Sequence, residues 1–188
     1  MTLRASDEEG LLRAAFRDAH GPRLNGFALL VTLGDQSLAA ALAADALDEG
    51  TRQADALRHP ERAAAWLRAR VLKATPQRHP RRNGPRDEER RMALAAIGVD
   101  GLTFGTLASL TVKERAALVA GDLEGFAVLD LEVILGSGPR VAERHVSEAR
   151  RKFFERQVAE DHAQFARIGR LGLRVREIVD QALTRNRR

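Results

Sequence analysis

Apolar residues recur every three or four positions along most of this 188-residue chain, which is the period of an α-helix. Between residues 11 and 75 these apolar stripes are separated by Gly21-Pro22, by Asp35 and by Pro60. Asp35 can cap a helix because its carboxylate accepts amide protons that lack a partner in the first turn. Pro60 suits the first position of a helix, where its missing amide proton is not needed. The pattern predicts several helices in this part of the chain.

The stretch 75–91, TPQRHPRRNGPRDEERR, has three prolines, one glycine and almost no apolar side chain. Such a composition cannot bury enough apolar surface to offset the entropy that is lost on ordering. We therefore expect a flexible linker over residues 76–91. It separates a first domain over residues 8–75 from a second domain over residues 92–156, which a C-terminal extension over residues 157–188 follows.

The second domain contains a signature of two helices joined by a tight turn, in residues 126–153. In the first of these helices Leu131, Ile134 and Leu135 are expected to face inward. Gly136 can adopt the left-handed conformation that ends a helix, and Ser137 can cap the next one. Upstream, Thr111 and Glu114 have the spacing of a capping box.

Basic residues mark one face of the second helix of this pair. Arg140, Arg144, Ser147 and Arg151 follow one another at spacings of four, three and four, on the face opposite the apolar positions. A helix-turn-helix with cations outward on its second helix is what reading the major groove of DNA requires. Arginine there can neutralise phosphates or bond guanine edges. The alternative is a basic helix face that is merely solvated.

A third periodic segment follows from residue 155 to the C-terminus and predicts a long amphipathic helix. Its apolar stripe comprises Val158, Phe165, Ile168, Leu171, Val175, Ile178 and Ala182. We expect this stripe to pack within the chain. Dimerisation, a regulatory protein and an anionic membrane surface are the alternatives that would also cover it.

Composition supports an all-α protein, because the chain is rich in alanine, leucine and arginine while glycine and proline lie mostly between the periodic segments. A formal net charge of +5 suits a polyanionic partner such as nucleic acid. The lack of cysteine excludes disulfides, thiolate zinc sites and cysteine nucleophiles. The longest apolar run, residues 27–33, is far shorter than the roughly 20 residues that cross a bilayer. We expect a cytoplasmic protein without a membrane span.

Enzymatic chemistry is not indicated by the polar residues. The five histidines are scattered, and His145 with Glu148 offers only two of the three or four ligands that a metal site needs. Gly136-Ser137-Gly138 lacks the spacing of a nucleophile elbow, and no phosphate-binding glycine loop is present. We therefore expect no catalytic residue, no metal, no cofactor and no enzyme activity.

The sequence also resembles a known family. Residues 107–153 resemble, without a gap, region 4 of sigma-70 factors of the extracytoplasmic-function (ECF) type. The resemblance rests on Leu110 with Arg115, on the charged turn 122–125, on Leu135-Gly136 and on Ala149-Arg150. Residues 16–35 and 63–72 are similar to region 2 of the same family, and the order of the two regions agrees.

This resemblance implies a promoter-specificity subunit of bacterial RNA polymerase, which makes and breaks no bond. Its second domain would place Arg140, Glu143, Arg144, Ser147, Glu148 and Arg151 at the −35 element of promoter DNA. Its first domain would dock on the polymerase core and read and melt the −10 element. The residues left for melting are Arg58, His59, Arg62, Trp66 and Arg68. Those left for polymerase docking are Asp45, Asp48 and Glu49.

The chain departs from the family pattern in both regions. Ala40 and Ala41 stand where the family has an acidic pair, and no aromatic residue lies between Leu47 and Trp66. Glu143 and Glu148 occupy positions that are usually basic, although a glutamate can accept a hydrogen bond from cytosine N4. Two alternatives therefore stay open: a sigma-like mimic or regulator that binds an anti-sigma factor or another partner without promoter recognition, and another helix-turn-helix transcriptional regulator.

Overall fold

The computed structural model describes residues 2–53, 59–77 and 86–185, and it is all-helical, which confirms the predicted fold class. Nine helical elements cover these residues. They are α1 (Thr2–Val31), α2 (Gln36–Arg52), α3 (Pro60–Ala74), α4 (Asp87–Ala95), α5 (Gly101–Ser109), α6 (Val112–Leu118), the π-helical turn η1 (Val119–Leu123), α7 (Val128–Leu135) and α8 (Pro139–Arg185). None of the helices in these ranges is long and apolar enough to cross a membrane.

Most of the predicted helix ends are confirmed. The Asp35 carboxylate accepts a hydrogen bond of 3.2 Å from the Leu38 amide and caps α2. Pro60 is the first residue of α3. Thr111 and Glu114 form the capping box of α6, each side chain bonding the other residue's backbone amide. These local signals act within one turn, so sequence alone is enough to read them.

Two predicted interruptions are wrong. The helix α1 continues through Gly21-Pro22, and α8 continues through residues 153–155, where we expected one helix to end and another to begin. Proline removes only one hydrogen bond of α1, whereas the turns that follow bury Leu24, Phe27 and Val31 almost completely. No glycine or proline stands near residue 154, so nothing ends α8 there.

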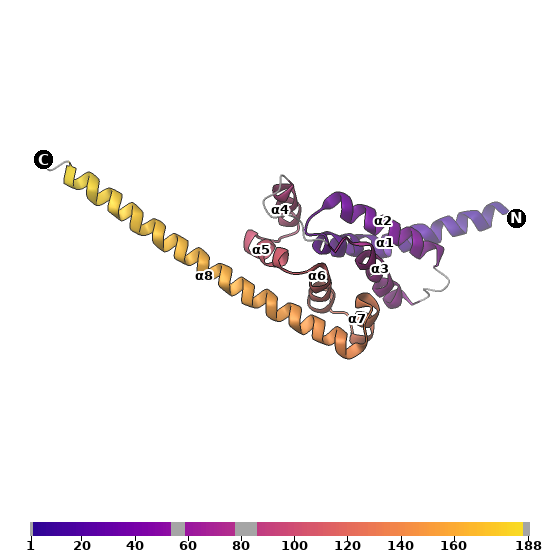
Figure 1. Ribbon diagram of the computed structural model, residues 1–188. Coiled ribbons are helices and arrows are strands. Elements are labelled where there is room, and N and C mark those ends of the chain that lie inside the picture. The colour runs from indigo at the N-terminus through magenta and orange to yellow at the C-terminus, as the bar shows by residue number, and fades with distance from the viewer. Residues whose placement is uncertain (1, 54–58, 78–85, 186–188) are drawn as a thin grey trace.

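Two layers of helices share one hydrophobic core (Figure 1). The first layer consists of α1, α2 and α3, which pack on one another, and the second of α5, α6, η1, α7 and the start of α8. The layers meet where α3 packs against α7 and α6 and where α1 packs against α6 and η1. The two layers contain residues of the two predicted domains, but α4 begins at Asp87, inside the stretch 76–91 that we expected to be a flexible linker. The division into independent domains stays a prediction.

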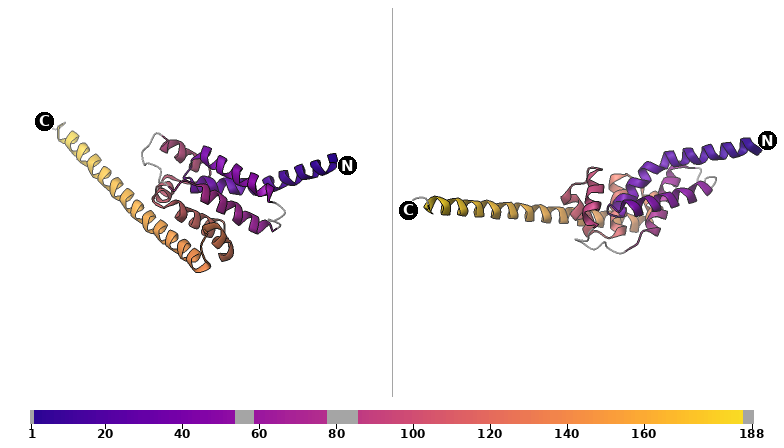
Figure 2. Two further views of the ribbon diagram at one scale, coloured as in Figure 1. Left: turned by 45° about the vertical axis from the view of Figure 1, so that its right-hand side comes forward. Right: turned by 90° about the horizontal axis from the view of Figure 1, so that it is seen from above.

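The ends of the chain lead away from this core in opposite directions (Figures 1 and 2). The start of α8 contacts α5, α6 and α7. Its C-terminal half then extends beyond the bundle in all three views instead of turning back onto it. We expected residues 157–188 to pack within the chain, and this expectation is wrong, because the backbone of α8 leads away from the bundle.

Candidate nucleic-acid and polymerase interfaces

The turn between α7 and α8 begins as the sequence predicted. Gly136 is left-handed, with φ 59° and ψ 43°, and it ends α7. Leu131, Ile134 and Leu135 are buried, as expected. Ser137 does not cap α8, because the helix begins two residues later and the Gly138 carbonyl accepts its first hydrogen bonds. The buried Ser137 hydroxyl has no hydrogen-bond partner among the described residues.

The residues predicted to face the −35 element all lie on the exposed side of α8. Arg140, Glu143, Arg144, Ser147, Glu148 and Arg151 are exposed, whereas Ala142, Val146 and Ala149 on the opposite side are buried. The side chains of Arg144 and Arg151 are 64% and 60% exposed. The structure thus brings the predicted set together on one accessible surface, which we call the α8 outer face.

Intrahelical ion pairs moderate the positive charge of the α8 outer face. Arg144 Nε lies 3.9 Å from Glu148 Oε1, and Arg151 Nη1 lies 2.8 Å from Glu155 Oε1. Exposed pairs of this kind contribute only about 0.3–0.5 kcal/mol, so a phosphate can compete for either arginine. No ion pair of Arg140 is formed within the described residues.

Two other cations of α8 hold the helix on the protein instead of facing outward. Arg150 donates to both carboxylate oxygens of Asp122 in η1, one bond being 2.9 Å long. Lys152 pairs with Glu114 of α6. Burial raises the pKa of Glu114, but the hydrogen bonds from Lys152 and from Thr111 lower that pKa below its usual value overall. Together with the buried Ala142, Val146 and Ala149, these pairs place one side of α8 against the protein, so the outer face is turned to solvent.

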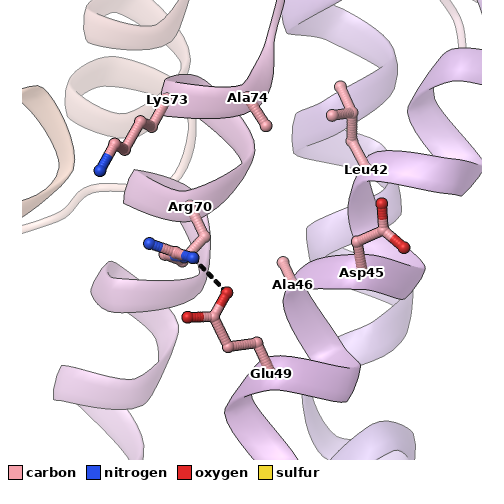
Figure 3. A pocket seen from close by; sticks show the side chains of 7 residues that line it. All are labelled: Leu42, Asp45, Ala46, Glu49, Arg70, Lys73 and Ala74. Atoms are coloured by element: carbon pink, nitrogen blue, oxygen red, sulfur yellow. Dashed lines mark hydrogen bonds and ion pairs between the residues drawn. The ribbon is translucent and has the colours of Figure 1, made fainter.

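The predicted polymerase-binding carboxylates lie on α2, beside a pocket of about 340 Å³ between α2 and α3. Figure 3 shows Asp45 and Glu49 at this pocket, opposite Arg70 and Lys73 of α3, with a hydrogen bond between Glu49 and Arg70. Asp48 lies outside the pocket and pairs with Arg17 of α1. Asp45 forms no ion pair within the described residues, so it is the carboxylate of the three that is most available to a partner.

The predicted −10 residues are not gathered on one surface. His59 and Arg62 are exposed at the start of α3. Trp66 is half-buried, and the Arg70 guanidinium lies 5.5 Å from the centre of its ring. Arg58 lies outside the described residues.

Arg68, the last member of that set, is buried between the two layers. Its side chain is only 3% exposed. Its Nε donates 2.6 Å to Glu124 Oε2, its Nη2 donates to Glu124 Oε1, and its Nη1 donates 3.0 Å to the carbonyl of Ala64. The guanidinium also lies 4.8 Å from the centre of the Phe126 ring and 5.6 Å from that of Phe27. Nucleic acid can reach Arg68 only if the two layers separate at this point.

The role of Arg115 was not visible in the sequence, where it served only as part of a family motif. Its side chain is 1% exposed and makes no ion pair with a carboxylate among the described residues. Its Nε donates 3.0 Å to the Val31 carbonyl, and its Nη1 donates 2.6 Å to that of Leu110 and 3.3 Å to that of Leu107. Arg115 therefore caps the C-terminal ends of α1 and α5, where carbonyls lack intrahelical partners and the helix dipoles are negative.

Burial lowers the pKa of Arg115 to about 10, and the positive charge of Arg90 acts in the same direction. The guanidinium nevertheless stays charged at neutral pH. The described residues contain no group of three or more histidine or acidic side chains placed to hold a metal ion.

Comparisons of the chain with protein-family models, with curated proteins and with solved structures found no match.

Proposed function

We propose that the protein is a sigma-like transcription initiation factor of the ECF type, which binds the bacterial RNA polymerase core and directs it to promoter DNA. The observation that carries the proposal is the α8 outer face: an exposed row of Arg140, Arg144, Ser147 and Arg151 that directly follows the left-handed turn at Gly136. This is the surface that a helix-turn-helix needs in order to enter a major groove.

The charges of this face fit a duplex. Arginine bonds guanine edges bidentately or neutralises phosphates, and Ser147 can donate to either. Glu143 and Glu148 would repel phosphates, so they would not add to the affinity for DNA. They would instead select the base sequence by accepting hydrogen bonds from cytosine. The α2 carboxylate Asp45 and its neighbours at the pocket would supply the contact with the polymerase core.

The direct test is in vitro transcription with purified core polymerase on a pooled promoter library. The proposal expects promoter-dependent initiation by the intact chain, and no initiation from any promoter would overturn it. A parallel duplex-binding assay uses Arg144→Ala and Arg151→Ala, each of which should cost about 1–3 kcal/mol if the arginine contacts a base edge.

Arg23→Ala is the matched control for this assay. Arg23 is an exposed residue of α1, so its replacement removes the same charge from a different helix. If all three variants lose the same affinity, the loss reflects net charge alone, and the assignment of the α8 outer face is refuted.

A second candidate is a sigma-like regulator that captures an anti-sigma factor or another protein without reading a promoter. The burial of Arg68 favours this candidate, because it removes one of the few side chains left for contact with the −10 element. Capture of an anti-sigma factor, together with a lack of initiation on the pooled library, would select the regulator.

A further inference from the structure

The contact between Arg68 and Glu124 joins residues of the two layers that are 56 positions apart in the sequence. Glu124 is 17% exposed, so both charges of this bidentate ion pair are largely removed from water. Phe27 belongs to the first layer and Phe126 to the second, and the guanidinium lies within 6 Å of both ring centres. A single guanidinium thus contacts a carboxylate and two aromatic rings across the layer boundary.

We infer that this cluster, which we call the latch, holds the two layers closed and keeps Arg68 away from nucleic acid until a partner opens it. The latch comprises Arg68, Glu124, Phe27 and Phe126. The part of the inference that concerns DNA rests on the proposed function, whereas the mechanical part does not.

Arg68 and Glu124 stabilise each other's charge only when the layers are closed. When the layers are together, removing Glu124 leaves the Arg68 guanidinium buried, and its remaining partners among the described residues are the Ala64 carbonyl and the two rings. When the layers are apart, water solvates the same guanidinium at no such cost. Removing one partner of a buried pair is strongly unfavourable. Loss of Glu124 therefore raises the open population by a factor on the order of 100 to 1,000.

A second group of contacts lies where α1 ends, one helical turn beyond Phe27 of the latch. Arg115 donates to the Val31 carbonyl, and Arg90 of α4 donates 2.8 Å to Asp35 at the start of α2. These contacts act as the hinge when the latch opens.

The experiment uses the full-length chain with two dyes and single-molecule energy transfer. Because the protein has no cysteine, Ala41→Cys in α2 and Ala159→Cys in α8 give two unique attachment points, both exposed and both outside the latch. The test variant is Glu124→Lys, which places a cation against Arg68. The matched control is Asp122→Lys, two residues earlier, which makes the same charge change but breaks only the pair with Arg150 inside the second layer.

The expected result is a new low-efficiency population in Glu124→Lys, with unchanged helical circular dichroism, and a single high-efficiency population in both the parent and Asp122→Lys. The reversed pair Arg68→Glu with Glu124→Lys should recover part of the high-efficiency population. If Glu124→Lys gives only the high-efficiency population, the latch is refuted. If it loses its helical signal instead of opening, the two layers form one cooperative unit, and the latch is refuted as well.

A DNA-binding measurement separates this inference from the proposed function. Opening should raise the affinity of Glu124→Lys for a single-stranded oligonucleotide more than tenfold above that of Asp122→Lys, which carries the same added charge. Opening without this gain leaves the latch standing and refutes the role of Arg68 in contacting the −10 element.

Discussion

Replacing Arg115 by methionine tests whether one buried guanidinium joins two helix ends. Methionine fills much of the space of the arginine stem but donates no hydrogen bond. The Leu107 carbonyl keeps a partner, because it also accepts from the Leu110 amide at 3.1 Å. The carbonyls of Val31 and Leu110 lose the bonds of 3.0 and 2.6 Å that Arg115 donates.

The magnitude follows from these two carbonyls. Each buried carbonyl left without a partner costs about 1–3 kcal/mol, so the two together cost roughly 2–6 kcal/mol. Burying the guanidinium is itself unfavourable, as its lowered pKa indicates, and methionine removes that cost. We therefore expect the free energy of unfolding to fall by about 2–3 kcal/mol, at the lower end of the range. For a chain of this size, the melting temperature should fall by roughly 5–10 °C.

The assay is urea unfolding followed by circular dichroism, with the melting temperature as a second measurement. Arg144→Met is the control, because Arg144 is exposed and its replacement should change the free energy of unfolding by less than about 0.5 kcal/mol. Arg115→Lys keeps the charge but cannot reach both helix ends as a fork does, so it should recover only part of the loss. A change below about 0.5 kcal/mol in Arg115→Met would refute the assignment of Arg115 as a shared cap.

Two further predictions concern the contacts around α1. Gly34→Ala should destabilise the protein by more than about 2 kcal/mol, since Gly34 has φ 81° and an added Cβ would overlap the Arg90 carbonyl. The control is Gly98→Ala, which measures the backbone strain alone, because Gly98 has φ 89° and nothing lies within 4 Å of the added Cβ. Equal losses of stability in the two variants would contradict the close approach of α4 to Gly34. Burial, and secondly the charge of Arg68, lowers the pKa of His20 below 6.5, so the unfolded chain binds a proton more readily and stability should fall as the pH drops below about 6.5. His20→Asn should therefore lose less melting temperature than the parent between about pH 7.5 and about pH 5, and His162→Asn, which replaces an exposed histidine in the same way, is the control for the substitution itself.

Much of the fold could be predicted from the sequence, because most of its helix ends are set by residues within one turn. Asp35, Pro60, the Thr111–Glu114 box and Gly136 all act locally, and each ends or begins a helix as expected. The exposure of the α8 outer face followed from the same helical period. The continuity of α1 through Pro22 could not be predicted in this way, since it depends on apolar surface that α1 buries against other helices.

The burial of individual arginines could not be predicted from the sequence. Arg68 and Arg144 each lie on a helix that the family resemblance assigns to DNA, yet one is 3% exposed and the other 64%. The sequence gives both the same charge and the same helical context, and the difference arises from Glu124, 56 positions away from Arg68. A cation near an apolar stripe can pair across the core, as Arg68 does, or cap a helix end, as Arg115 does. Only the tertiary partner decides between these roles, so cationic residues predicted to bind nucleic acid need to be tested first for a buried carboxylate or a helix end within reach.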